Sequence, residues 1–348
     1  MSWKIKQKPE DFVVTEVIFD KTEESWKEKY RKLHGKTAET EKRYLWFTLK
    51  KTGRDFFEVM AAIGLDLKIG TRDLGYSGTK DKNAVTIQTV SVPIEKEEDV
   101  RKLDIKGVEI SDFRHRNRPI RLGEHKGNNF EIVVRNIEKD DIEAISKRIE
   151  DIKTDGMINY FGEQRFGSLR KVNDEIGRLL VHGELEQAAK RIIDEVGGYY
   201  GKRMSAFLRK HPHHYRGALK QMPLRLLKLF IHAYQSKIWN ECAIRYNGEN
   251  TVIPIIGYAT DLRNYPKVRE IAEGVLDEEK TDRLDFKNYT FKELSSRGAE
   301  RPYLVFPENL EYKFGNDELN KGKRKMTLKF YLPKGSYATE LIRQLEQA

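Results

Sequence analysis

The sequence predicts an α+β fold with two domains. Three observations support this prediction: strand and helix patterns follow one another without a regular βαβ repeat, the middle of the chain is largely helical, and a strand pattern returns near the end. With 348 residues, the chain is long enough for two domains that each bury a core.

The first part of the chain contains four strand patterns and one helix pattern. Apolar and β-branched residues indicate strands in four segments: 11–19, 43–53, 84–94 and 129–137. Between the second and third of these, apolar side chains recur at helical spacing from Phe56 to Leu65. We expect this helix to begin near Asp55 and to end at Gly64.

The middle of the chain is predicted to be helical from about Asn159. Residues 171–196 and 224–246 carry apolar side chains three and four positions apart. A strand pattern returns over 325–333, and a short helix pattern over 337–347 closes the chain. Four residues of that last strand share one face: Met326, Leu328, Phe330 and Leu332. Since the two ends are alike in kind, we expect one discontinuous domain, 1–157 with 306–348, interrupted by an insertion, 158–305.

Positive charge is concentrated in one long segment. The formal net charge of +10 indicates an anionic partner only weakly. Residues 196–240, however, contain nine Lys and Arg and no Asp or Glu, with aromatic residues between them. This pattern favours a phosphate-binding surface for nucleic acid. The alternative is a solvated helix face whose counter-charges come from elsewhere, such as the acidic run from Glu273 to Asp282.

A second basic segment, residues 113–130, contains four Arg and one Lys with a single Glu. Pro119, Gly123 and Gly127 indicate turns, so we expect a hairpin or loop that projects arginines. Phe130 at its end has two interpretations. The ring could stack on an unpaired base, or it could be the first core residue of the next strand, which the pattern alone favours.

Apolar runs, the single cysteine and the histidines bear on the cellular compartment and on the kinds of site that the chain can form. The chain has no apolar run long enough to span a membrane and no signal-peptide pattern at its start, so we expect a cytoplasmic protein without a membrane partner. The single cysteine, Cys242, excludes an intramolecular disulfide and a paired-thiol zinc site, and we expect it to be buried. The histidines of residues 211–214 lack nearby carboxylates or thiols, which favours RNA contacts or a plain loop over a metal site.

The stretch GYSGTKDKNAVTIQ, residues 75–88, places one carboxylate between two lysines at the start of a strand. Two glycines permit a tight turn there, and the flanking Lys80 and Lys82 favour the ionised form of Asp81. A positioned carboxylate can act as a nucleophile or a base at a sugar carbon. On the residues alone, a surface ion cluster is the commoner role of such a triplet.

The same stretch resembles the signature of the TruD family, tRNA pseudouridine synthase D, whose pattern is roughly G-x-K-D-x-x-A-x-T-x-Q. Five positions match it: Lys80, Asp81, Ala84, Thr86 and Gln88. Five further segments are similar to the family in the expected order: KPEDFVVTE (8–16), HKGNNFEIVVR (125–135), NYFGEQRFG (159–167), HAYQSKIWN (232–240) and LPKGSYATELIR (332–343). The resemblance therefore spans nearly the whole chain.

The resemblance implies a fold and a set of site residues. It implies a pseudouridine synthase catalytic domain with a mixed, largely antiparallel sheet, interrupted by an inserted α/β TRUD domain. It also implies that Asp81 is the nucleophile in the isomerisation of uridine to pseudouridine, that Phe130 stacks on the target base, and that Asn128 helps position Asp81. By motif position and charge, Lys80 and Arg165 are candidates to pair with Asp81 or with a phosphate.

The resemblance further implies tRNA as the partner, with uridine 13 as the target. Isomerisation requires no metal and no redox cofactor, and we infer no obligate protein partner. The alternative function is a non-catalytic RNA-binding protein or RNA chaperone, although a carboxylate beside phosphates would weaken such a protein's binding. A metal-dependent nuclease would require several clustered carboxylates, whereas the stretch around Asp81 offers one.

Overall fold

The computed structural model describes residues 3–18, 43–167 and 171–347. The chain forms two compact units, of which the first comprises residues 1–155 and 306–348 and the second comprises residues 156–305. The second unit is therefore an insertion between two segments of the first. The sequence predicts changes of domain after residues 157 and 305, whereas the compact units change after Asp155 and Val305.

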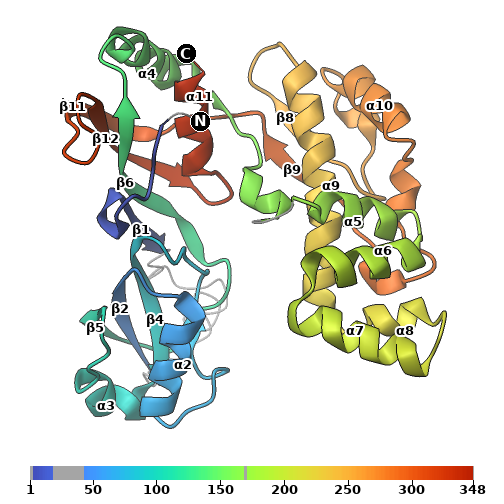
Figure 1. Ribbon diagram of the computed structural model, residues 1–348, viewed down its shortest axis with the longest axis horizontal. Helices are drawn as coiled ribbons and strands as arrows, with labels where there is room; N and C mark the ends of the chain where they lie inside the picture. The colour runs from blue at the N-terminus through green and yellow to red at the C-terminus, as the bar shows by residue number, and fades with distance from the viewer. Residues whose placement is uncertain (1–2, 19–42, 168–170, 348) are drawn as a thin grey trace, which may run out of the picture. The chain divides into compact units, whose positions relative to one another are not determined.

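Over its described residues, the first unit is built on one mixed sheet of eight strands (Figure 1). Its strands are β1 (Phe12–Ile18), β2 (Tyr44–Thr52), β3 (Gly75–Tyr76), β4 (Val85–Pro93), β5 (Val108–Arg116), β6 (His125–Ile137), β11 (Glu308–Asn316) and β12 (Arg324–Pro333). The order is β11-β12-β6-β1-β4-β2-β5, and β3 pairs with β4. Strands β1 and β4 are parallel, and the other pairs of this sheet are antiparallel across the described residues. The predicted mixed, largely antiparallel sheet is confirmed.

The strand predictions agree with these bounds except at two places. The predicted first strand extends to Phe19, which lies outside the described residues. Strand β6 begins at His125, so Phe130 lies within the strand and not at its start. Gly127 is also inside β6 and marks no turn: a Cβ there would lie 2.2 Å from the Leu332 carbonyl oxygen of β12. Glycine at this position therefore permits the close approach of two strands.

The helices of the first unit are α2 (Phe56–Asp66), α3 (Glu97–Arg101), α4 (Ile142–Asp155) and α11 (Ala338–Glu346). Helix α2 begins where expected, because the Asp55 carboxylate accepts hydrogen bonds from the Phe57 and Glu58 backbone N–H groups at 2.9 and 3.1 Å. The helix continues past Gly64 to Asp66, two residues beyond the predicted end. The chain then turns at Lys68, whose φ of 53° lies in the left-handed region.

Apolar residues cover two ends of one sheet face and leave its middle polar. At one end, the core of α2 packs against Leu45 and Phe47 of β2 and Val90 of β4, which are fully buried. At the other end, the four predicted core residues of β12, Met326 to Leu332, are 0 to 3 % exposed, which confirms their common face. Figure 1 shows α4 and α11 beside this end of the sheet. The polar residues described below lie between these two apolar regions.

The second unit is mostly helical, with two small sheets. Its elements are β7 (Met157–Ile158), α5 (Asn173–Val181), α6 (Leu185–Arg191), α7 (Gly198–Lys210), α8 (Tyr215–Leu219), α9 (Leu224–Arg245), β8 (Val252–Ile255), α10 (Arg269–Glu278), β9 (Ala299–Pro302) and β10 (Leu304–Val305). Strands β8 and β9 pair, as do β7 and β10. The predicted helix over 171–196 is broken after α5, because Gly183 adopts a φ of +75° that continues no helix.

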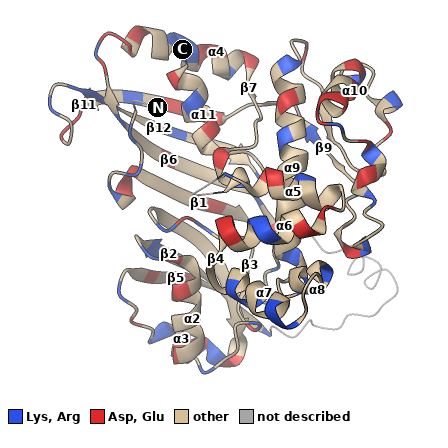
Figure 2. Cartoon of the chain, turned by 45° about the vertical axis from the view of Figure 1, so that its right-hand side comes forward, with Lys and Arg blue, Asp and Glu red and all other residues tan. Residues whose placement is uncertain are grey.

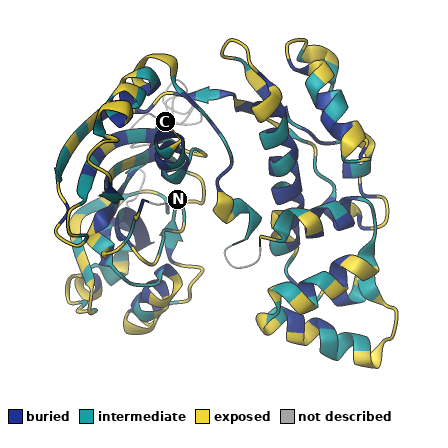
Figure 3. Ribbon diagram, turned by 45° about the horizontal axis from the view of Figure 1, so that its top comes forward, coloured by how far each residue is buried: buried dark blue, intermediate teal, exposed yellow. Residues whose placement is uncertain are grey.

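Helix α9 forms the centre of the second unit. It is the predicted 224–246 helix, and Tyr234, Ile238 and Trp239 on it are fully buried. Figure 3 shows dark blue, the colour of buried residues, along this long helix. Helix α5 packs closely on it, since a Cβ on Gly177 would lie 2.0 Å from the Phe230 carbonyl oxygen. Cys242 on the same helix is 1 % exposed, as predicted, and burial raises the pKa of its thiol to about 12. No helix among the described residues is both long enough and apolar enough to cross a membrane.

Candidate active site

Five neighbouring strands align their side chains in rows across the middle of this sheet face. The register places Lys51 of β2, Thr86 of β4, Val14 of β1, Phe130 of β6 and Phe330 of β12 in one row. Side chains of a strand point alternately to opposite faces, so residues two positions along form a second row on the same face. Two residues of the predicted site, Phe130 here and Asn128 in the second row, therefore belong to one surface.

The second row is apolar at its ends and polar in its centre. It consists of Leu49, Gln88, Glu16, Asn128 and Leu332 on the same five strands. Glu16 is 8 % exposed and Gln88 is 2 % exposed, although both have polar side chains in the middle of a sheet. Buried polar groups of this kind require partners. Part of that requirement is met by the loop that carries Asp81.

The loop from Ser77 to Asp81 is attached to this face by hydrogen bonds to its backbone. The Gln88 amide donates to the Gly78 carbonyl oxygen at 3.2 Å, and the Lys51 ammonium donates to the Asp81 carbonyl oxygen at 2.6 Å. Lys51 is 1 % exposed, and burial lowers its pKa although the charge of Asp81 opposes that shift. These two bonds fix the backbone on both sides of Lys80, so the position of Asp81 is set by the sheet.

Gly75 allows the chain to enter this loop close to its neighbours. A Cβ at Gly75 would lie 2.2 Å from the Ser91 hydroxyl oxygen and 2.6 Å from the Ile120 carbonyl oxygen. Gly78 has ordinary space around it, since its nearest neighbour atoms would be 3.7 Å from a Cβ. Of the two glycines in the stretch, Gly75 is therefore the one that packing requires.

The Asp81 carboxylate projects from this loop and pairs with a lysine from the beginning of the chain. Lys6 Nζ lies 2.5 Å from Asp81 Oδ2, and the two side chains are 18 % and 39 % exposed. The same ammonium lies 4.2 Å from the centroid of the Phe12 ring. Asp81 is therefore a partly accessible carboxylate with one cation beside it, at the edge of an aromatic cluster.

A buried ion cluster positions the segment that carries Lys6. Arg135 of β6 donates to Asp11 at 2.7 and 3.0 Å and to Asp317 at 3.0 Å. Lys4 and Arg135 also exchange backbone hydrogen bonds at 2.8 and 2.9 Å, which ties the chain down two residues before Lys6. Although burial of Asp317 opposes ionisation, hydrogen bonds from the Asn136 backbone and from Arg135 are among those that lower its pKa to about 2. Lys6 itself has a φ of 59°, a left-handed conformation that side-chain-bearing residues adopt only where their surroundings impose it.

Lys80, a candidate to pair with Asp81 or with a phosphate, pairs in the structure with a carboxylate of β1. Its ammonium contacts Glu16 Oε1 at 2.9 Å, with side-chain exposures of 9 % and 0 %, and the cation on the Asp81 carboxylate is Lys6. The Ser77 hydroxyl also donates to Glu16 Oε1, so Glu16 binds both the beginning and the end of the loop. The Lys80 side chain thus points under the loop and attaches it to β1.

His125 completes this group of residues. Its Nδ1 lies 3.3 Å from the Ser77 hydroxyl oxygen. Burial, and then the positive charge of Lys80, lower the pKa of His125, whereas the charge of Glu16 raises it. A neutral imidazole is therefore favoured beneath the loop.

Four buried side-chain oxygens on this face have no donor among the described residues. They are Glu16 Oε2, Thr86 Oγ1, Gln88 Oε1 and Asn128 Oδ1. All four come from the two rows, on strands β1, β4 and β6. Leaving such atoms unpaired costs about 1 to 3 kcal/mol each. The middle of the face is thus rich in hydrogen-bond acceptors next to the Asp81 loop.

Phe130 lies in an aromatic cluster beside these acceptors. Its ring stacks on Phe330 at a centroid distance of 5.3 Å with an interplanar angle of 23°, and it meets Phe12 edge-on at 6.2 Å. The ring is half-buried, so part of its surface packs against the protein and part is accessible to solvent. Phe12 thus links Phe130 to Lys6 and the Asp81 carboxylate.

The second basic segment does not form a loop of free arginines. Arg114 and Arg116 lie in β5, and Arg118 pairs with Glu124 at 2.6 Å across the turn that contains Gly123. The Trp46 indole donates to the Arg118 carbonyl oxygen at 2.8 Å. The sequence prediction of a projecting loop is therefore wrong for Arg114 and Arg116, because β5 continues through both.

Arg165, the remaining predicted site residue, belongs to the second unit. Its Nε donates to the Ser236 hydroxyl at 3.1 Å, and its guanidinium lies 5.5 Å from the Phe161 ring. The Asn240 amide makes two hydrogen bonds to the Phe161 backbone, at 2.9 and 3.0 Å. Ser236 and Asn240 therefore attach the segment NYFGEQRFG to helix α9.

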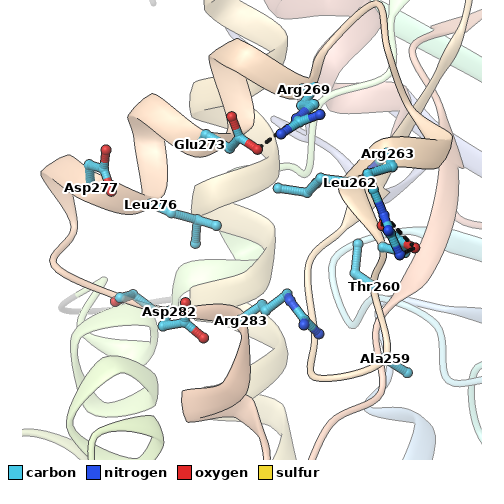
Figure 4. Close-up of a pocket in the computed structure, with 12 residues that line it drawn as sticks. Ala259, Thr260, Leu262, Arg263, Arg269, Glu273, Leu276, Asp277, Asp282 and Arg283 are labelled. Carbon is cyan, nitrogen blue, oxygen red and sulfur yellow. Dashed lines mark hydrogen bonds and ion pairs between the residues drawn. The ribbon is translucent and has the colours of Figure 1, made fainter.

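The second unit also contains a pocket of about 420 Å³ (Figure 4). Two arginines in it pair with carboxylates of the same pocket: Arg263 with Asp261 at 2.7 Å, and Arg269 with Glu273 at 2.8 Å. Hydrogen bonds from Arg263 lower the pKa of Asp261 to about 2. Across the described ranges, no group of three or more His, Cys, Asp or Glu side chains is arranged to hold a metal ion.

Comparison with known proteins identifies the chain. The family model described as tRNA pseudouridine synthase D (TruD) matches residues 1–199, 197–248 and 241–345. The chain belongs to the TruD family. "Probable tRNA pseudouridine synthase D" of Methanococcoides burtonii is 28 % identical in an alignment that covers 98 % of this chain and 92 % of the relative. "Probable tRNA pseudouridine synthase D 2" of Methanocaldococcus jannaschii is 30 % identical in an alignment that covers 98 % of this chain and 91 % of the relative.

A solved structure agrees with this assignment. The crystal structure described as that of the "Putative tRNA pseudouridine synthase D (TruD)" from Methanosarcina mazei superimposes with a TM-score of 0.75 at 26 % sequence identity. The match covers 99 % of this chain and 93 % of that one. The α+β fold is therefore that of the TruD family.

The spacing of the TruD signature follows from this geometry. Thr86 and Gln88 are two residues apart on β4, so they share the face on which the Asp81 loop lies, and Ala84 directly precedes the strand. Two residues that sequence reasoning did not assign to the site, Lys6 and Glu16, come from β1 and the segment before it. Glu16 could have been found from its position, since it follows Phe12 and Val14 on the buried face of a strand. The sequence around Lys6 contains no comparable pattern that would assign this residue to the site.

Proposed function

We propose that the chain isomerises uridine to pseudouridine in tRNA, at position 13, with Asp81 as the nucleophile. The observation that carries the proposal is the Asp81 carboxylate, 39 % exposed and 2.5 Å from the Lys6 ammonium, on a loop fixed to the sheet by Lys51 and Gln88. Membership of the TruD family supplies the reaction class.

The reaction suits such a carboxylate. The bond between C1′ and N1 of the uridine breaks, the uracil turns, and a bond forms between C1′ and C5. C5 then loses its hydrogen as a proton, and N1 takes up a proton. The reaction is an isomerisation with no net oxidation, and the proposal assigns it no cofactor. A carboxylate held at the sugar acts on C1′, and the adjacent Lys6 ammonium keeps that carboxylate oriented.

The face beside Asp81 has groups that suit the detached uracil. Uracil presents N–H donors, and the unpaired oxygens of Thr86, Gln88 and Asn128 are acceptors. The half-buried ring of Phe130 offers a stacking surface for the base that leaves the RNA helix. In this proposal Asn128 acts on the base side of the site, and Lys80 acts by attaching the loop to Glu16. A contact between Arg165 and an RNA phosphate stays a prediction.

The target position is tested by mapping pseudouridine in a tRNA transcript. The transcript is incubated with the protein, treated with a carbodiimide that marks pseudouridine, and read by primer extension. We expect one stop that reports position 13 and none in a transcript with cytidine at that position. A stop elsewhere would contradict the assigned position while leaving the reaction class intact. Binding without any stop would favour the RNA-binding or chaperone alternative.

A further inference from the structure

Helix α7 of the second unit concentrates the basic run of the sequence on one outward face. Exposed residues recur along it at positions 199, 202, 203, 209 and 210, which are three, four and seven positions apart and so share one side of the helix. They are Tyr199, Lys202, Arg203, Arg209 and Lys210. The opposite side of the helix carries the buried Gly201 and Met204. Figure 2 shows Lys and Arg in blue on this helix.

The cations of this face lack acidic partners. Within the described part of the chain, no carboxylate oxygen lies within the 4.0 Å ion-pair distance of Lys202, Arg209 or Lys210. Other exposed cations of the same unit are paired, such as Lys267 with Glu249 at 3.0 Å. The face therefore carries uncompensated positive charge, in contrast to the surface around α10.

Arg203 is held in place by neutral groups. Its guanidinium donates to the Tyr199 hydroxyl at 3.3 Å and to the Gln221 side-chain oxygen at 3.2 Å, and it lies 5.6 Å from the Tyr199 ring. These contacts orient the guanidinium without neutralising it. Tyr199 is 66 % exposed beside it.

Helix α8 and the residues after it limit the extent of the face. Tyr215 donates a hydrogen bond to Glu186, and Arg216 lies 4.0 Å from Glu293. Acidic groups therefore lie beside the residues of α8. Lys220, next to the Gln221 that binds Arg203, is exposed and lies 5.8 Å from the Phe291 ring. On this face, the uncompensated cations are therefore those of α7, with Lys220 at the margin of the face.

We propose that this face of α7 binds the phosphate backbone of the tRNA substrate. From Tyr199 to Lys210 the helix rises roughly 16 Å at 1.5 Å per residue, which is enough to meet several successive phosphates. Lysine and arginine side chains bind phosphates and release counterions, and an exposed tyrosine ring can receive an unpaired base. The identity of the RNA rests on the proposed function.

A membrane surface does not fit the same helix. An interfacial helix inserts its apolar side into the lipid, whereas the apolar side of α7 is buried within the protein at Met204. The exposed side carries Lys202, Arg209 and Lys210, which meet phosphates without insertion. Since Asp81 belongs to the first unit, the α7 face should contribute to affinity for tRNA and not to the chemical step.

The test compares two triple variants with the same change in net charge. One replaces the α7 cations: Lys202→Gln, Arg209→Gln and Lys210→Gln. The control replaces exposed, paired cations of the same unit: Arg263→Gln, Lys267→Gln and Arg269→Gln. Binding of a tRNA transcript is measured by fluorescence anisotropy from about 50 to 300 mM KCl, and release of C5 tritium is measured as a function of tRNA concentration. Thermal melting verifies that both variants are folded.

The α7 variant should bind tRNA about tenfold or more weakly near 100 mM KCl. The slope of log K against log salt should decrease by roughly 2 to 3, since each phosphate contact contributes about 0.7 to 0.9. The loss should raise KM with little change in kcat. Equal losses in both triple variants, or none in the α7 variant, would overturn the proposal. If the wild type binds tRNA with this salt dependence but releases no tritium, the proposed reaction is wrong, whereas binding of tRNA by the α7 face is still supported.

Discussion

The Lys80 ammonium lies 2.9 Å from Glu16 Oε1, and both side chains are almost fully buried beneath the loop that carries Asp81. Glu16 also accepts a hydrogen bond from Ser77, so one carboxylate of β1 binds two residues of that loop. Lys80, the lysine next to the proposed nucleophile Asp81, therefore anchors the loop that positions Asp81.

Removing one member of this pair should destabilise the protein strongly. Glu16→Gln leaves the Lys80 ammonium buried without a counter-charge, and Lys80→Met leaves the Glu16 carboxylate in the same state. Each should lower the free energy of unfolding by about 3 to 5 kcal/mol, as for other broken buried pairs. Urea denaturation measures the change.

The double variant, Glu16→Gln with Lys80→Met, distinguishes an ion pair from general packing. It contains no buried charge at this place, so it should be clearly more stable than the sum of the two single losses predicts. At a temperature where all three variants are folded, kcat should fall about 10-fold to 100-fold in the single variants while tRNA affinity changes little. Additive losses of stability in the double variant would contradict the account.

Lys6 should be needed for turnover. Lys6→Met removes the ammonium that lies 2.5 Å from Asp81, and we expect kcat to fall about 100-fold because the carboxylate loses its fixed orientation. Lys4→Met is the matched control, since its ammonium contacts Asn320 and not Asp81. Single-turnover rates on saturating tRNA measure the difference. Equal rates in the two variants would rule out this role for Lys6.

Phe130 should act on base capture more than on overall RNA affinity. Phe130→Leu keeps apolar volume but removes the flat ring, so kcat/KM should fall more than the affinity for tRNA. Phe330→Leu alters the other member of the stacked pair, which is 3 % exposed, and reports the effect of packing alone. Parallel measurements of tRNA binding and turnover decide the question. If both variants lose binding and turnover equally, Phe130 is a packing residue.

His125 should make stability depend on pH below about 6.5. Burial and the charge of Lys80 lower its pKa in the folded protein, so the unfolded chain takes up a proton at a higher pH than the folded one. The free energy of unfolding should therefore decrease as pH falls below 6.5, by at most about 1.4 kcal/mol per pH unit, and by less because the half-buried ring is partly screened. His125→Gln should remove this part of the slope. An unchanged slope between pH 5 and 7 in urea titrations would count against it.

Much of the fold could be predicted from local patterns. Strand β12 and helix α9 follow directly from apolar spacing, because a buried strand face and a buried helix both leave strong periodicity. The break after α5 was missed, since Gly183 lies in a segment whose apolar spacing continues across it. The sequence predicts a turn at Gly127, because the close approach of β6 to β12 that requires glycine depends on a strand from the other end of the chain.

The site could be predicted in part. The position of Asp81 at the start of β4 and the common face of Thr86 and Gln88 follow from sequence spacing and the family resemblance. The partners of Asp81 and Lys80 do not, because Lys6 is 75 residues from Asp81 and Glu16 is 64 residues from Lys80. Sheet pairing decides which of several lysines meets which carboxylate.

The central claim is that Asp81 performs an isomerisation, and release of tritium from C5 of labelled uridine in a tRNA transcript tests it most directly. Wild type and Asp81→Asn are compared in metal-free buffer, with tRNA binding measured on the same samples. We predict release by the wild type, none above background by Asp81→Asn, and similar binding by both. Release by Asp81→Asn at the wild-type rate would contradict the role of Asp81, and binding without release by the wild type would contradict the proposed reaction.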